Sequence, residues 1–121
     1  MKAWNRESRE LKLRYRERME AVNVRYNRQQ VDWTHDLEQA RNEKSLYLAK
    51  IKIQEDVDTN AEKLTMITDR IRRISLRKVE LDHERKLALL ALERERADEI
   101  DALEAKYGVN LDEEREEVVD A

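Results

Sequence analysis

Large apolar side chains recur every eleven residues along the first half of the sequence. One series reads Trp4, Tyr15, Tyr26, Leu37 and Leu48, and a second reads Leu11, Val22 and Trp33. Eleven residues make three turns at about 3.67 residues per turn, close to the α-helical value, so each series stays on one helix face. Leu81, Leu92 and Leu103 repeat the same step later in the chain. The repeat predicts long helices that pack lengthwise on one another.

Residues that break long helices are almost absent. The 121 residues include no Pro, no Cys and one Gly, at position 108. Pro and Gly are the residues that most often turn a backbone sharply, so a β-rich or mixed fold is disfavoured. A charged fraction of 44% would also suit a disordered chain, but 40% of the residues are apolar and they recur in register. We therefore expect an all-α fold.

Two segments carry the signals of helix ends. Residues 55–63 contain Asp58, Thr59 and Asn60, which are preferred N-cap residues, and Thr59 with Glu62 has the spacing of a capping box. Gly108 suits the left-handed position that follows a helix. We expect a helical hairpin over residues 1–107 with a turn near 56–60, and a short acidic helix or tail over residues 108–121. One unbroken helix through the turn is the alternative, because residues 55–63 contain neither Pro nor Gly.

Charge and register favour the hairpin. Residues 1–30 carry nine basic and four acidic side chains, a net of +5, whereas residues 93–121 carry four and twelve, a net of −8. An antiparallel hairpin brings these ends together, although an antiparallel dimer of long helices would do the same. Folding at residues 57–58 makes facing residue numbers add up to about 115 and gives nearly every layer an apolar partner. The polar layers, at Gln30, Lys44, Lys78, Arg85 and Arg96, are expected to fix the register.

The residues expected to close this coiled-coil-like hairpin form one stripe, called the closing stripe. They are Trp4, Leu11, Tyr15, Val22, Tyr26, Trp33, Leu37, Leu48, Ile67, Leu81, Leu89, Leu92, Ile100 and Leu103.

A second apolar stripe lies about 200° away around each helix, by helix geometry, and is called the outer stripe. It comprises Leu13, Val24, Val31, Leu46, Leu76, Val79, Leu87 and Leu90. A hairpin sealed by one stripe leaves the other exposed, and contiguous exposed apolar surface marks association. The alternative is a single wide core stripe. We expect the outer stripe to pack on further helices, from a second copy or from a larger protein complex.

A third feature is a cluster of cations, called the basic surface. It consists of Arg41, Lys44, Lys50, Lys52, Arg70, Arg72, Arg73, Arg77 and Lys78. Such a surface could bind the phosphates of a nucleic acid or an acidic partner. A solvated charged face is the simpler interpretation, because acidic residues flank both segments and no base-reading motif accompanies them.

The sequence gives no reason to expect catalysis. Glu80 and His83 have the Glu-x-x-His spacing of di-iron bundles, and His35 lies near them in the predicted hairpin, but these residues do not share a face with the closing stripe. We therefore predict no metal, no cofactor, no small-molecule substrate and no enzymatic activity. Interface or solvent-facing histidines are the expected interpretation.

These patterns favour a non-enzymatic structural, assembly or adaptor protein that acts through lateral helix packing, comparable in architecture alone to a scaffold or virion-type subunit. A nucleic-acid-binding or acidic-mimic regulator that uses the basic surface is the alternative. No apolar run resembles a secretory signal or a membrane span, so we expect a location in the cytoplasm or in a particle assembled inside the cell.

Overall fold

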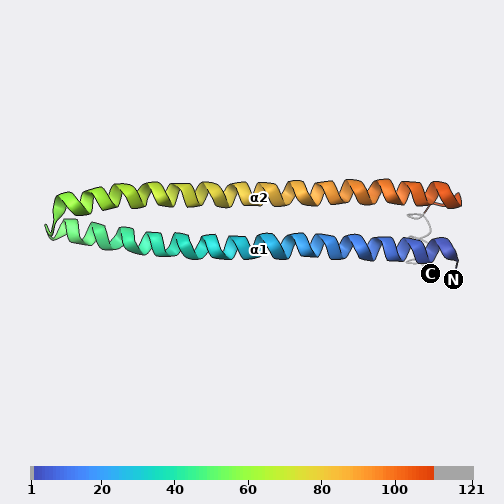
Figure 1. Cartoon of the computed structure of the whole chain (residues 1–121), viewed down its shortest axis with the longest axis horizontal. Helices are drawn as coiled ribbons and strands as arrows, with labels where there is room; N and C mark the ends of the chain where they lie inside the picture. Colours follow the sequence, from blue (N-terminus) through green and yellow to red (C-terminus); the bar gives the residue numbers. More distant parts are fainter. Residues whose placement is uncertain (1, 111–121) are drawn as a thin grey trace. The chain divides into compact units, whose positions relative to one another are not determined.

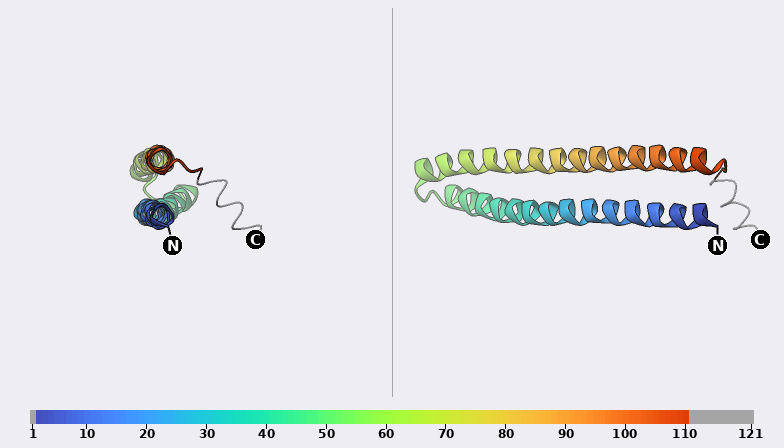
Figure 2. Two further views of the ribbon diagram at one scale, coloured as in Figure 1. Left: turned by 90° about the vertical axis from the view of Figure 1, so that its right-hand side faces the viewer. Right: turned by 45° about the vertical axis from the view of Figure 1, so that its right-hand side comes forward.

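Two long helices pack against each other as a hairpin. The structure is a computed structural model and describes residues 2–110. Helix α1 spans Ala3–Lys52 and helix α2 spans Val57–Tyr107, and they lie side by side in each view (Figures 1 and 2). The described residues contain no strand. The predicted all-α hairpin is therefore confirmed, whereas the short third helix predicted after Gly108 falls mainly on residues outside the described part.

The turn between the helices comprises residues 53–56, so it ends where the sequence analysis expected it to begin. The Glu55 N–H donates to the Lys50 carbonyl (2.9 Å), and the Gln54 N–H donates to the Ile51 carbonyl (3.0 Å). This pair of bonds is a Schellman motif, and Gln54 holds the left-handed position with φ 59°. Because Gln occupies a position where Gly is usual, the sequence did not reveal the end of α1.

Asn60 has a different role from the predicted N-cap. It lies inside the first turn of α2 and is buried, and its side-chain amide donates to the Glu55 carbonyl at 2.8 Å. Its backbone N–H donates to the Asp56 carbonyl at 2.9 Å. The side chain therefore ties the turn to α2 instead of capping a helix that starts after it. Asp58, in the first turn of α2, is well placed to interact with the positive end of the helix dipole.

The far end of α2 follows the prediction. Gly108 has φ 63°, and the Val109 N–H donates to the Glu104 carbonyl at 3.2 Å. A glycine in the left-handed conformation, followed by a residue whose N–H donates to a carbonyl five residues earlier, is the usual end of a helix.

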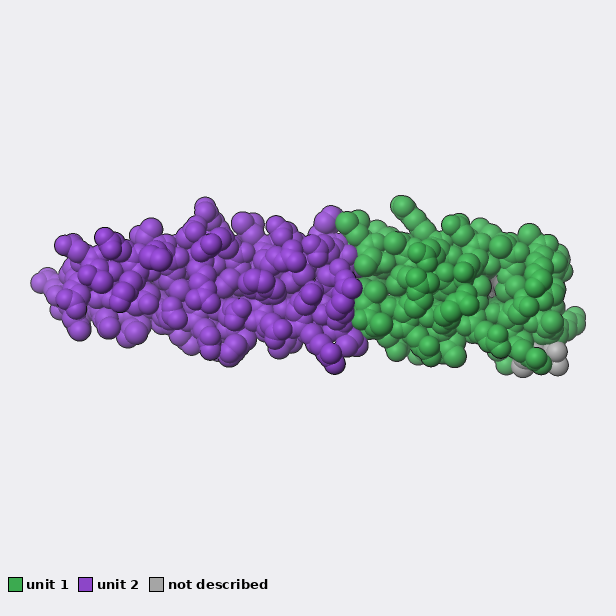
Figure 3. Space-filling model, in the orientation of Figure 1, with its two compact units in different colours: residues 1–23, 86–121 green, residues 24–85 purple. Residues whose placement is uncertain are grey.

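The hairpin comprises two compact units, each with segments of both helices (Figure 3). Unit 1 comprises residues 1–23 and 86–121, and unit 2 comprises residues 24–85. In unit 1, the buried cluster is Leu11, Tyr15 and Leu92, with Met19, Val22 and Ile100 packed against it. In unit 2, it is Leu37, Ala40, Ile67 and Ile74, with Trp33, Tyr47, Leu64 and Ile71 packed against it.

The buried residues of the two units follow different spacings. In unit 2, the buried and half-buried seam of α1 steps alternately by four and three, as in a heptad, through Tyr26, Gln30, Trp33, Leu37, Ala40, Lys44, Tyr47 and Ile51. The seam of α2 does the same through Asn60, Leu64, Ile67, Ile71, Ile74, Lys78, Leu81 and Arg85. In unit 1, two steps of four follow each other, through Trp4, Ser8, Leu11, Tyr15, Met19 and Val22. The eleven-residue repeat thus describes unit 1, and heptads describe unit 2.

Leu48 departs from the expected closing stripe for this reason. Its side chain is 47% exposed. Extending the eleven-residue series beyond Tyr26 predicts a buried residue at position 48, but heptad spacing places the seam at Tyr47 and Ile51, both half-buried. Leu48 therefore lies beside the seam rather than in it.

Candidate functional site: the outer stripe and the basic surface

Most of the closing stripe lines the seam between the helices. Eight members are buried: Leu11, Tyr15, Tyr26, Leu37, Ile67, Leu81, Leu92 and Leu103. Five are half-buried: Trp4, Val22, Trp33, Leu89 and Ile100. Fully burying one large apolar side chain stabilises the folded state by about 1.5–3 kcal/mol. The seam is therefore the main source of the hairpin's stability.

The outer stripe is open to solvent along its whole length. All eight residues are between 48% and 69% exposed. Unit 2 carries Val24, Val31, Leu46, Leu76 and Val79, and unit 1 carries Leu13, Leu87 and Leu90. In unit 2, Val24 and Val31 line a shallow hollow together with Asn27, Arg28 and Asp32. The exposed Leu48 and Met66 add to the apolar surface of unit 2.

Every member of the basic surface belongs to unit 2, but the members are not equally available. Asp69 pairs with Arg72 (2.7 Å) and Arg73 (3.4 Å). Arg77 pairs with carboxylates on its own helix, and these neighbours raise the pKa of its guanidinium. Lys44, Lys50 and Lys78 are half-buried. The remaining three, which are exposed and make no ion pair with any residue between 2 and 110, are Arg41, Lys52 and Arg70.

A groove at the edge of the basic surface, called the tip groove, was not evident from the sequence. Glu43, Tyr47, Lys63, Met66, Ile67, Asp69, Arg70 and Arg73 line it. The Lys63 ammonium lies 5.9 Å from the centre of the Tyr47 ring, a cation–π contact between the two helices. Met66 is 72% exposed although it is apolar. The heptad spacing of α1 was the signal that could have placed Tyr47 here.

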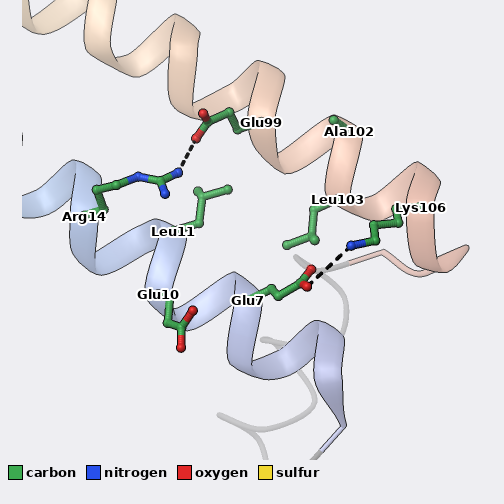
Figure 4. Close-up of a pocket in the computed structure, with 8 residues that line it drawn as sticks. All are labelled: Glu7, Glu10, Leu11, Arg14, Glu99, Ala102, Leu103 and Lys106. Carbon is green, nitrogen blue, oxygen red and sulfur yellow. Dashed lines mark hydrogen bonds and ion pairs between the residues drawn. The ribbon is translucent and has the colours of Figure 1, made fainter.

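Three ion pairs connect the two helices of unit 1. Arg14 pairs with Glu99 (2.7 Å), Arg18 with Glu95 (3.2 Å), and Lys106 with Glu7 (3.4 Å). Figure 4 shows Leu11 and Leu103 between the first and last of these pairs. The residue numbers of each pair add up to 113, close to the predicted 115. Two of the three pairs join a basic residue of the start to an acidic residue of the end, as the charge pattern predicts, whereas the pair of Lys106 and Glu7 has the opposite sense.

Tyr15 lies at the centre of this arrangement. It is only 1% exposed, and the guanidinium groups of Arg14 and Arg18 lie 5.6 and 5.0 Å from its ring centre. Burial raises the pKa of the Tyr15 phenol, and a hydrogen bond and the negative charge of Glu99 raise it further. Tyr15 is therefore a structural side chain that stays protonated near neutral pH.

The histidines and carboxylates do not form a metal site in the described structure. His35 and His83 are exposed, and a ring nitrogen of His35 lies 3.1 Å from the side-chain amide of Gln39. Between residues 2 and 110, no group of three or more His, Asp or Glu side chains is placed to hold a metal ion. Neither helix has, within that range, an apolar stretch that could cross a membrane.

Comparison with known proteins gives no further guide. No protein-family model matches the chain, and no significant match was found among curated proteins or solved structures.

Proposed function

We propose that this chain is a non-enzymatic assembly protein that acts through lateral packing of its helices. The observation that carries the proposal is the outer stripe, whose eight apolar residues are each at least 48% exposed. Single exposed apolar residues are ordinary on protein surfaces, but a series with helical spacing on both helices of a hairpin is typical of a surface that another helix covers.

The exposed area supports the same proposal. The chain exposes 9302 Å² and has a mass of 14.6 kDa. Folded monomers of that mass expose about 6900 Å², and each partner in a standard protein–protein interface buries about 800 Å². The excess of about 2400 Å² is therefore roughly three times the area that one such interface removes from a chain, so the hairpin has ample surface for a partner to cover.

The native mass in solution tests this function. Sedimentation equilibrium with light scattering at micromolar concentration is expected to give a dimer or a larger species. Val31→Asp, on the outer stripe, should reduce that mass while circular dichroism stays helical, because a charge would have to be buried at the interface. Gln29→Asp is a matched control, since Gln29 is exposed on α1 on the opposite side of the helix from Val31. A monomeric wild-type protein would contradict self-assembly.

A further inference from the structure

We propose that the tip groove of unit 2 binds the acidic segment of residues 111–121 from a second copy of the chain. The inference rests on the proposed self-assembly and names one contact that would build it. The segment reads LDEEREEVVDA, with six acidic residues and one Arg, a net charge of −5.

The groove offers chemistry that complements this segment. Lys63, Arg70 and Arg73 supply three cations, and Tyr47 with Met66 supplies apolar surface between them. Arg70 makes no ion pair with residues 2–110, and Lys63 contacts the Tyr47 ring. The segment carries apolar Leu111, Val118 and Val119 among its acidic residues, so it can match both components.

Two carboxylates in the groove favour a peptide over a nucleic acid. Glu43 and Asp69 line the groove beside the cations, and Asp69 pairs with Arg73. A phosphate backbone carries one charge sign throughout and is repelled by carboxylates at close range. The acidic segment contains Arg115 between its carboxylates, so it carries both signs, as the groove does.

The length of α2 assigns the segment to another copy. Between Arg70 and Tyr107 there are 37 steps of helix, which at 1.5 Å per residue make about 55 Å. Even Asp120, thirteen residues beyond Tyr107, reaches at most about 47 Å when the chain is fully extended. The acidic residues of a chain therefore cannot lie in its own groove while α2 is helical. If two copies exchange segments reciprocally, the contact closes a symmetric pair.

Energy transfer between full-length chains tests this contact. Because the chain contains no Cys, a donor dye is attached to Thr59→Cys, an exposed position one turn before Lys63, in one preparation and an acceptor to Ala121→Cys in another, and the two are mixed. We expect transfer between copies in the mixture. Arg70→Glu with Arg73→Glu should weaken it, raising the concentration for half-maximal transfer roughly tenfold. Adding Glu113→Arg and Glu114→Arg to the partner should restore it.

A matched control separates the groove from general charge effects. Arg94 and Arg96 are exposed cations on α2 outside the groove, so Arg94→Glu with Arg96→Glu should leave the transfer unchanged. Transfer that is absent, or that both pairs of substitutions weaken equally, overturns the proposal. So does binding of random oligonucleotides that Arg70→Glu with Arg73→Glu abolishes while no transfer occurs between copies.

The two proposals fail in distinguishable ways. A native mass above the monomer, without transfer sensitive to Arg70 and Arg73, would leave self-assembly standing and remove only this contact. A monomeric mass at every concentration would remove both.

Discussion

Units 1 and 2 use the same two helices but hold them together differently. In unit 1, the seam follows the eleven-residue spacing, and three ion pairs join α1 to α2 on its surface. In unit 2, the seam follows heptads, and the ion pairs of Arg72, Arg73, Arg77 and Arg85 run within α2. The ion pairs that join two helices thus belong to unit 1, whereas these ion pairs of unit 2 stay within one helix.

The polar residues inside the seams show the same contrast. Unit 2 places Gln30, Lys44, Lys78 and Arg85 in its seam, all half-buried, and the Gln30 amide donates to the Lys78 carbonyl at 2.9 Å. A polar seam residue with one specific partner fixes register at a cost in stability. Unit 1 instead fixes its register by pairing charges at the surface. We therefore expect the stability of unit 1 to depend on the salt concentration and the stability of unit 2 to depend on substitutions inside its seam.

The largest expected difference concerns two leucines of unit 2. Leu37→Ala should lower the free energy of unfolding by about 2–5 kcal/mol, because it leaves a cavity in the heptad seam. Leu48→Ala should change it by no more than about 0.5 kcal/mol, because Leu48 lies beside the seam. Urea unfolding measures both. Equal losses would mean that the eleven-residue series continues through unit 2.

The two helix ends provide the next comparison. Gln54 and Gly108 both occupy left-handed positions after a helix, in unit 2 and unit 1 respectively. Gln54→Gly should raise the free energy of unfolding by about 1 kcal/mol, and Gly108→Ala should lower it by about as much, since only Gly adopts this conformation without strain. A Cβ at Gly108 would meet no atom within 4 Å, so the cost there is conformational. Melting temperatures that shift in opposite directions for the two variants would support this prediction, and shifts in the same direction would contradict it.

A smaller effect is expected from the charges that bridge unit 1. Arg14→Ala should cost about 0.2–1 kcal/mol of unfolding free energy at low salt, as exposed ion pairs do, and less at 1 M salt, where the Debye length is about 3 Å. Arg72→Ala in unit 2 is the control, because its pair with Asp69 lies within one helix. Urea unfolding at both salt concentrations gives the comparison. A salt effect of equal size in both variants would remove the contrast between the units.

The smallest effect is a pH dependence of unit 1 on the alkaline side. The pKa of Tyr15 is raised above 10.0 in the folded chain. The protonated Tyr15 phenol therefore stabilises the fold fully below the pKa of about 10 that Tyr has in the unfolded chain. This contribution is lost as the pH rises through the higher pKa of Tyr15 in the folded chain. Tyr15→Phe should make the fall in melting temperature above pH 10 shallower than in the wild type. An equally steep fall in the melting temperature of both proteins would show that the buried phenol does not contribute to this pH dependence.

Much of the fold follows from the sequence because helix spacing repeats over many residues. The hairpin, the exposure of the outer stripe and the glycine that ends α2 all rest on patterns of that kind. The turn begins earlier than predicted because Gln54 adopts a left-handed conformation that its residue type does not indicate. Asn60 is a preferred N-cap residue, but its side chain donates to the carbonyl of the preceding Glu55 instead.

The candidate site was less predictable because it depends on contacts between distant segments. Leu48 was misplaced because the eleven-residue series was extended across a change of spacing near Tyr26. The tip groove requires Tyr47 and Lys63 to meet across the hairpin, and the register that joins them depends on the position of the turn. Errors of a few residues in a turn therefore change which side chains form a surface site.

The most direct test of the two-stripe account compares two leucines that are two residues apart on α2. Leu92 is buried in the seam of unit 1, and Leu90 is exposed on the outer stripe. The native mass and helicity of Leu92→Asp and Leu90→Asp are measured side by side by light scattering and circular dichroism. The account predicts that Leu92→Asp unfolds or severely destabilises the hairpin, whereas Leu90→Asp remains helical and loses mass. Two variants that behave alike would contradict the division into a closing stripe and an outer stripe.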